Sequence, residues 1–365
     1  MEALLFRDSN DAVVEDVPRP TPEGDEVLIK VDRVQLSVTE CNLYEGADIA
    51  HSEQVRRRLA DGPARLFGHE FCGTVAETGK SVTDFEAGDR VYAPGKIPCR
   101  ECAYCTSSYE NYCPNKTQIG YDLPGGLAEY VLLPDDPLCT LPDEVSDAEG
   151  AAMQPFESTV RSVATADFTP GSVVAVVGTG VMGYQCAQLA KLFGADRVFA
   201  IDIDEEKLEI AERRGLIPVN AKTEDAPAVV REATGGIGAD LVFEAAGGPQ
   251  QHGTEGNDPL AQAMHVVRRG GTVVQIGHII GDIELSPRKV KSRKVDWVQP
   301  VYGVTAFSPN MDSARYAPKL VATDQVSIDD YITHELEGLD SFEELVEITL
   351  NKPKHGALGP AQIIL

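Results

Sequence analysis

The chain has 365 residues, 42% of them hydrophobic, which is long enough for two domains with separate cores. Acidic residues outnumber basic ones 58 to 32, and a net charge of −26 excludes nucleic acid and anionic membranes as partners, because this field repels both. No stretch approaches the roughly 20 apolar residues of a membrane span, and no signal peptide follows Met1, so we expect a soluble, cytoplasmic protein.

The first 155 residues contain segments with the pattern of β-strands. Apolar residues recur at every second position over 27–31, and 73–78 gives a second predicted strand. Between them, the polar segment 52–66 is predicted to be helical. We therefore expect a β-rich first domain.

A possible metal-binding pair lies just before the second strand, in Gly68-His69-Glu70. Imidazole and carboxylate are both zinc ligands. Adjacent side chains of an extended chain point to opposite faces, so His69 is the steadier ligand. Glu70 then coordinates weakly, exchanges with water or acts from outside the ligand shell.

Four of the eight cysteines lie within fifteen residues, at Cys99, Cys102, Cys105 and Cys113. In a cytoplasmic chain this spacing favours a metal over disulfides. Four thiolates fill a tetrahedral zinc shell and leave no open position for a substrate. An iron–sulfur cluster is the alternative, because four close cysteines also suit iron.

Residues 173–202 have the pattern of a strand, a glycine-rich turn, a helix and a second strand. Five apolar residues at 173–177 predict a strand buried on both faces, and residues 197–201 predict the next one. The turn between them reads Gly178-Thr179-Gly180-Val181-Met182-Gly183. This order is typical of a dinucleotide-binding unit.

Each position of that turn has a physical reason. Gly178 permits a tight turn, Gly180 lets the backbone approach a pyrophosphate, and Gly183 lets helix and strand pack closely. The first helical N–H groups, around Val181 and Met182, offer hydrogen bonds and the positive end of the helix dipole to the phosphates.

The second strand ends at Asp202, nineteen residues after Gly183. A carboxylate there accepts hydrogen bonds from ribose hydroxyls and repels a 2′-phosphate. No arginine follows before Arg213. The sequence therefore predicts NAD rather than NADP.

Strands and helices alternate from about 156 to 299, which implies parallel strands with right-handed crossovers. The loop 247–259 is a candidate rim of the site. The tail from about 300 returns to mixed strand and helix, and we expect it to rejoin the first domain.

Four motifs in this order resemble the zinc-dependent medium-chain dehydrogenase/reductase superfamily over essentially the whole chain: Gly68-His69-Glu70, the four cysteines, Gly88-Asp89-Arg90-Val91 and the glycine-rich turn. The resemblance implies an α/β fold with two domains. Residues 1–155, rejoined by 300–365, would form a GroES-like, β-rich catalytic domain. Residues 156–299 would form a Rossmann domain with a doubly wound parallel sheet.

The chain departs from the family pattern at the first catalytic ligand. The family's C-x-[ST]-[DE] motif aligns with Ser37-Val38-Thr39-Glu40, so a serine replaces the cysteine. Cys41 could substitute only if the local backbone is helical, and Glu40 could also turn inward. Thr39 matches the hydroxyl that relays the substrate proton, but the relay histidine beyond it is Asn42.

A glutamine stands at a further ligand position. Gln154 precedes Pro155, which resembles the archaeal glucose dehydrogenases, and could accept zinc through its carbonyl or hydrogen-bond a sugar hydroxyl. Glu157 is a possible substitute carboxylate. The excess of acids and the 13 lysines against 19 arginines resemble proteins of salt-loving archaea.

The resemblance implies a hydride transfer from a sugar, polyol or secondary alcohol to NAD. We expect a structural zinc and a weaker catalytic zinc held by His69 with Glu70 or Gln154, with Ser37 and Thr39 beside the substrate. We also expect a small-molecule substrate and a homodimer or homotetramer. A zinc-free enone or quinone reductase and a non-catalytic cofactor-sensing protein are the alternatives.

Overall fold

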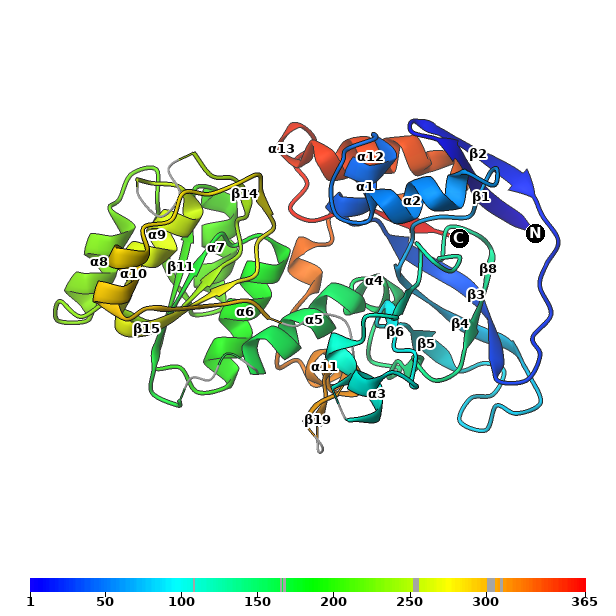
Figure 1. The fold of residues 1–365 in the computed structure, drawn as a ribbon, viewed down its shortest axis with the longest axis horizontal. Helices are drawn as coiled ribbons and strands as arrows, with labels where there is room; N and C mark the ends of the chain where they lie inside the picture. The colour runs from blue at the N-terminus through cyan, green and yellow to red at the C-terminus, as the bar shows by residue number, and fades with distance from the viewer. Residues whose placement is uncertain (108, 165, 167–168, 252–255, 301–305, 309–310) are drawn as a thin grey trace. The chain divides into compact units, whose positions relative to one another are not determined.

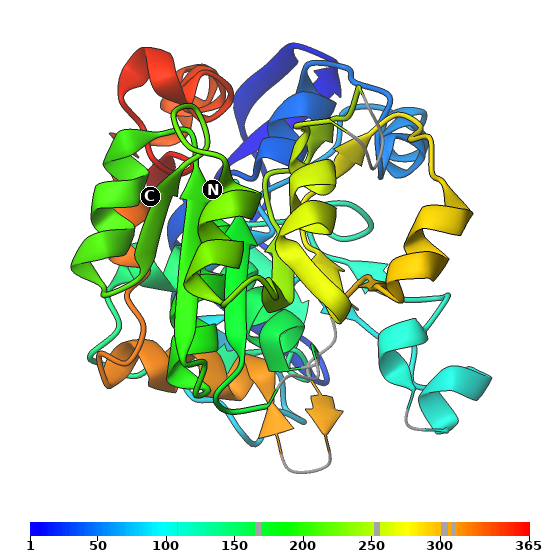
Figure 2. The ribbon, with the colours of Figure 1, turned by 90° about the vertical axis from the view of Figure 1, so that its left-hand side faces the viewer.

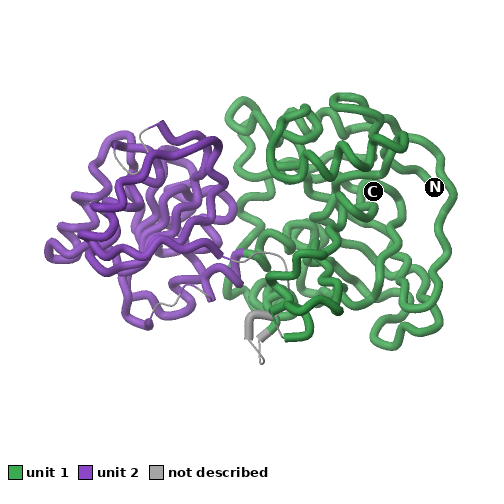
Figure 3. The backbone as a smooth tube through the Cα atoms, viewed as in Figure 1, with its two compact units in different colours: residues 1–158, 303–365 green, residues 159–302 purple. Residues whose placement is uncertain are grey.

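The computed structural model describes residues 1–107, 109–164, 166, 169–251, 256–300, 306–308 and 311–365. They divide into two compact units (Figure 3). Unit 1 comprises Met1–Ser158 and Gly303–Leu365, and unit 2 comprises Thr159–Tyr302. These boundaries fall within three residues of those that we expect from the sequence.

Unit 2 is built on a parallel sheet. Over its described residues, six strands pair in the order β12-β11-β10-β13-β15-β17, and every neighbouring pair is parallel. Figure 2 shows the arrows of its central strands running in one direction. The chain runs outward from β10 to one edge of the sheet and then from β13 to the other, which is the doubly wound Rossmann arrangement.

The elements of unit 2 have the following bounds: β10 (Val173–Val177), α6 (Val181–Leu192), β11 (Arg197–Asp202), α7 (Glu205–Arg213), β12 (Ile217–Asn220), α8 (Ala226–Ala233), β13 (Ala239–Glu244), β14 (Gly248–Pro249), α9 (Pro259–Val266), β15 (Val267–Gln275), β16 (Ile279–Ile280), α10 (Pro287–Arg293) and β17 (Asp296–Val298). The strand predicted at 173–177 is therefore confirmed. The predicted rim 247–259 includes residues 252–255, which lie outside the described residues.

Unit 1 contains a mostly antiparallel sheet. In the described part of this unit seven strands join, in the order β20-β21-β3-β4-β5-β9 with β8 also paired to β3, and only β20 and β21 run parallel. Figure 1 shows β3, β4 and β8 in this sheet. The β-rich first domain predicted from the sequence is confirmed.

The elements of unit 1 have the following bounds: β1 (Glu2–Asp8), β2 (Asp11–Asp16), β3 (Glu26–Gln35), α1 (Val38–Tyr44), α2 (Ser52–Leu59), β4 (Glu70–Thr78), β5 (Arg90–Tyr92), β6 (Lys96–Ile97), α3 (Ala103–Thr106), β7 (Thr117–Gln118), β8 (Tyr130–Pro134), β9 (Cys139–Thr140), α4 (Asp147–Ala151), β18 (Ala306–Ser308), β19 (Met311–Asp312), α11 (Ser313–Ala322), β20 (Glu335–Glu337), α12 (Phe342–Leu350), α13 (Lys352–His355) and β21 (Gln362–Ile364). Helix α5 (Met153–Ala164) begins in unit 1, and short 3₁₀ turns lie at Glu110–Tyr112, Asp329–Tyr331 and Leu339–Ser341.

The helix predicted over 52–66 is shorter than expected. Helix α2 ends at Leu59, because Gly62 adopts a positive φ of 120° and Pro63 follows it. A proline cannot supply a helical N–H, and the residue before it avoids helical angles. Over the described residues, no helix of the chain is long and apolar enough to cross a membrane.

The C-terminal tail completes the aromatic core of unit 1. The ring of Phe342, at the start of α12, packs edge-on against Phe6 at 5.4 Å and against Tyr44 at 5.0 Å between centroids. Phe342 is 2% exposed. Figure 1 shows α12 beside α1, so the helix that carries the site described below rests on the tail.

We expect the substitution Phe342→Ala to lower the free energy of unfolding by about 3–5 kcal/mol, the usual cost of removing a buried aromatic ring. Urea unfolding followed by circular dichroism measures this change. Tyr109→Ala is the matched control. Tyr109 is 60% exposed, so its replacement should lower the free energy of unfolding only slightly. Equal stability of the two variants would contradict the role of the tail.

Candidate active site and zinc centres

The four predicted cysteines converge on one point. Their sulfur atoms all lie within 4.8 Å of one another, with separations of 3.5 Å for Cys102–Cys105, 3.6 Å for Cys99–Cys113, 3.8 Å for Cys102–Cys113 and 3.9 Å for Cys99–Cys105. Zinc with bonds of about 2.3 Å to four tetrahedral sulfurs requires about 3.8 Å between them. The arrangement therefore fits a closed zinc site, and no two of these cysteines are joined in a disulfide.

The backbone around this cysteine cluster prepares it for a metal. Arg100 has a positive φ of 62°, and its guanidinium forms ion pairs with Glu110 and Asp136, which hold the turn in place. Backbone N–H groups of Glu101 and Cys102 lower the pKa of Cys99 to about 6. Cys99 is therefore available as the thiolate, the form that binds metal.

His69 is held by the buried carboxylate of Glu40, which turns inward as the sequence allowed. Glu40, which is fully buried, accepts a hydrogen bond from Nδ1 of His69 at 2.7 Å and a longer one from its backbone N–H at 3.3 Å. Burial alone would raise the pKa of Glu40 and lower that of His69. The pair reverses both effects, so the pKa of Glu40 is lowered and that of His69 is raised.

Glu40 is itself held by the start of α1. Its backbone N–H donates to Oγ of Ser37 at 3.2 Å, and its Oε2 accepts from both N and Oγ of Ser37 at 3.1 Å. This is a capping box. Ser37 therefore does not point its hydroxyl at a metal. It contributes to the site through Glu40.

Cys41 does not replace the missing ligand. The backbone is helical there, which is the condition for Cys41 to take the place of the family's cysteine ligand. The thiol, however, forms a hydrogen bond with Thr349 of α12 and lies in the apolar core. Burial raises the pKa of this thiol, which disfavours the thiolate. Thr39 lies half-buried in the first turn of α1, and its hydroxyl has no hydrogen bond to the described residues.

Glu70 approaches the other nitrogen of His69. Its Oε1 lies 3.8 Å from Nε2 of His69, and its Oε2 accepts a hydrogen bond from Gln35 at 2.6 Å. Two ligands of one tetrahedral zinc, with bonds of about 2.0–2.1 Å, lie about 3.4 Å apart. Burial raises the pKa of Glu70 to about 7. His69 and Glu70 therefore fit adjacent positions of a zinc shell.

Gln154 lies on the same side as His69, across Gly95. A Cβ atom added at Gly95 would come within 3.5 Å of Nε2 of Gln154 and 3.6 Å of Cδ2 of His69. Gln154 also hydrogen-bonds weakly to Pro94 and Ser158, at 3.5 Å each. Its amide is therefore within reach of the space in front of His69.

The donor set around His69 is nevertheless sparse. Within the described residues, the cysteine cluster is the one group of three or more His, Cys, Asp or Glu side chains close enough to share a metal. Glu157 is turned elsewhere, because Ser313 and Ser158 donate to its carboxylate. A metal at His69 would rely on Glu70 and the neutral Gln154.

The glycine-rich turn has the predicted geometry. Gly178 has a φ of 88°, and a Cβ there would lie 2.6 Å from the backbone N of Ala246. A Cβ at Gly183 would lie 1.9 Å from the carbonyl oxygen of Gly178. At Gly180, which caps α6, no protein atom lies within 4 Å of such a Cβ, so this glycine leaves open space at the helix N-terminus.

The carboxylate of Asp202 is anchored on both oxygens. Oδ2 accepts from N and Oγ1 of Thr179 at 2.5 and 2.9 Å, and Oδ1 accepts from the N–H groups of Ile203 and Asp204 at 2.7 and 3.0 Å. Asp202 is thereby tied to the turn that would bind the pyrophosphate. Lys207, the first basic residue after it, pairs with Asp204 at 3.6 Å.

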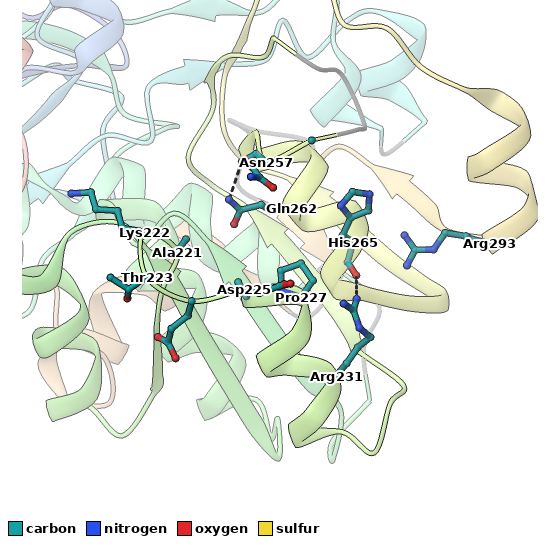
Figure 4. A pocket seen from close by; sticks show the side chains of 13 residues that line it. Ala221, Lys222, Thr223, Asp225, Pro227, Arg231, Asn257, Gln262, His265 and Arg293 are labelled. Atoms are coloured by element: carbon teal, nitrogen blue, oxygen red, sulfur yellow. Dashed lines mark hydrogen bonds between the residues drawn. The ribbon is translucent and has the colours of Figure 1, made fainter.

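A cavity of about 920 Å³ lies elsewhere in unit 2 (Figure 4). Lys222, Arg231, His265 and Arg293 are among its lining residues. Gly256 and Asn257 of the predicted rim line it, but none of the predicted metal-binding, cofactor-binding or catalytic residues does, so we do not assign the active site to this cavity.

The comparisons with known proteins agree with this geometry. Residues 23–143 match the alcohol dehydrogenase GroES-like domain, and residues 181–314 match the zinc-binding dehydrogenase family. The chain is 30% identical to L-threonine 3-dehydrogenase of Bacillus subtilis, over 95% of each chain. It is 27% identical to sorbitol dehydrogenase of the same species, over 90% of this chain and 91% of the relative.

A solved structure supports the same assignment. A zinc-binding dehydrogenase of Sinorhizobium meliloti, bound to NADP, superposes with a TM-score of 0.83 and 27% identity, over 100% of this chain and 99% of that one. The chain thus belongs to the zinc-dependent medium-chain alcohol dehydrogenases, oxidoreductases with a GroES-like and a Rossmann domain.

Proposed function

We propose that the protein oxidises a hydroxyl-bearing carbon of a polyol, sugar or secondary alcohol by hydride transfer to NAD. The observation that carries the proposal is the Glu40–His69 pair, which fixes the proton on Nδ1 and leaves Nε2 for a metal beside Glu70. Ligating histidines commonly donate their other ring N–H to a carboxylate in this way. The sorbitol dehydrogenase relative supports the polyol class.

Each residue of this centre has a separate task. His69, Glu70 and Gln154 would hold a zinc ion, which when bound polarises the substrate oxygen and favours loss of its proton. Glu40 orients His69. Thr39, half-buried and without another partner among the described residues, passes the hydroxyl proton outward.

The preference for NAD rests on the charges that follow β11. Asp202, Asp204, Glu205 and Glu206 form an acidic stretch, and the Lys207 ammonium is already paired within it. A 2′-phosphate would therefore meet several negative charges. The relative from S. meliloti binds NADP, so this preference distinguishes the chain from that relative.

We expect the variant Cys105→Ser to contain about one zinc ion fewer per chain than the wild type, because a tetrahedral shell loses one thiolate. Elemental analysis of the purified protein measures this number. Cys139→Ser, outside the cluster, is the control. An unchanged zinc content in Cys105→Ser would refute the structural zinc site.

We expect kcat/KM to be higher with NAD than with NADP. The substitution Asp202→Asn should lower the ratio of the two kcat/KM values, NAD over NADP, by about 10-fold, which corresponds to about 1.4 kcal/mol. Asparagine keeps one oxygen as the acceptor for Thr179 but removes the charge. Steady-state kinetics with both cofactors measure the ratio. A wild type that favours NADP would overturn the prediction.

We expect His69→Ala to lose activity while circular dichroism shows an intact fold, because the proposed metal loses its steadiest ligand. Wild-type turnover should fall with EDTA and return with added zinc, whereas the cysteine cluster keeps its metal longer. Full activity in His69→Ala would favour the zinc-free reductase instead.

Ser37→Cys provides the complementary gain of function. A thiolate would add a charged, soft ligand and should make turnover less sensitive to EDTA. The same change removes the serine cap of α1, so stability should fall by about 1 kcal/mol. Unchanged EDTA sensitivity would indicate that position 37 does not face the metal.

A further inference from the structure

Two lysines stand beside the proposed centre without ionic partners. Lys96 begins β6, which pairs antiparallel with β7, and Lys116 directly precedes β7. Both side chains are partly buried, and neither ammonium group has a hydrogen bond or ion pair with the described residues. By contrast, the exposed Lys354 pairs with Glu347 at 2.5 Å.

Unpaired lysines in this position are unexpected. The chain has 58 acidic and 32 basic residues, so carboxylates are abundant. Lysine is rarely buried unless its charge is compensated. Burial, together with the charge of Lys116, lowers the pKa of Lys96 to about 8, and the charge of Glu157 compensates only in part.

Lys96 lies close to the residues that would hold the substrate, and the charge of Lys116 acts on Lys96. Lys96 follows Gly95, and the Cβ position of Gly95 borders both His69 and Gln154. The charge of Lys96 also acts on His51 and His69. The ring of Tyr121 lies between these histidines, with centroids at 4.6 Å from His51 and 5.8 Å from His69.

We infer that Lys96, supported by Lys116, binds an anionic group of the substrate, so that the substrate is an alcohol or polyol carrying a phosphate ester or a carboxylate. This inference rests on the proposed function for the location of the reacting hydroxyl. An ammonium group binds such anions as a point charge, and partial burial strengthens the attraction. The anion in turn compensates the two lysine charges.

Binding of simple anions tests the inference without turnover. The zinc-loaded protein, saturated with NAD so that the pyrophosphate site is filled, is titrated calorimetrically with inorganic phosphate and separately with acetate. We expect Lys96→Met to weaken binding by about 10- to 100-fold, the effect of losing a charge-assisted contact. Lys116→Met should weaken it less.

Lys80→Met is the matched control, because Lys80 is exposed on a turn of unit 1 and should leave binding unchanged. Stronger binding of phosphate than of acetate identifies a phosphate ester, and the reverse identifies a carboxylate. If the wild type binds neither anion, or if Lys96→Met binds like the wild type, the inference is wrong.

Turnover provides a second readout. The ratio of kcat/KM for D-sorbitol 6-phosphate, or for D-gluconate, to that for D-sorbitol should fall by about 10- to 100-fold in Lys96→Met. An unchanged ratio would overturn the inference. If no alcohol is oxidised but anion binding still depends on Lys96, the anion site stands and the proposed function fails. If neutral polyols are oxidised without anion binding, only the inference fails.

Discussion

The contact between Glu40 and His69 is the interaction on which the centre in unit 1 depends. A fully buried carboxylate is costly unless it is paired and hydrogen-bonded, and Glu40 meets both conditions through His69 and the N-terminus of α1. The capping box that starts the helix is thus part of the centre. Because α1 rests on α12 of the tail, residues 299 positions apart help to determine where the imidazole points.

The two proposed zinc sites follow different chemical rules. The cysteine cluster supplies four soft thiolates at nearly equal separations, so it can fill a tetrahedral shell. The centre at His69 offers one imidazole, one carboxylate whose pKa is raised, and one neutral amide. Such a set binds zinc less tightly, but it leaves a position for the substrate oxygen. The serine at position 37 improves the cap of α1 while it removes a ligand.

Local sequence patterns made much of the fold and part of the candidate site predictable. Strand β10, the glycine-rich turn and Asp202 follow from short-range rules, because steric limits on a tight turn act within a few residues. The spacing Ser37-x-x-Glu40 also matches a capping box, which we did not predict from the sequence. The direction in which the Cys41 thiol points was not predictable, because it depends on Thr349 of a helix that is distant in the sequence. Oligomeric state and adaptation to salt stay predictions, because a single chain without partners does not bear on them.

The net charge of the molecule repels an anionic ligand, whereas the lysines near His69 attract one. A net charge of −26 repels an approaching anion, but at an ionic strength of about 0.15 M this field is screened beyond about 8 Å. Within that distance the nearest groups dominate. Beside His69 these are the carboxylates of Glu40 and Glu70 together with Lys96, whose charge is reinforced by Lys116. A negative ligand would therefore gain from short-range attraction where it lies nearer to the two lysines than to these carboxylates. Higher salt would shift the balance further toward binding, since it screens the distant acids more than the partly buried lysines.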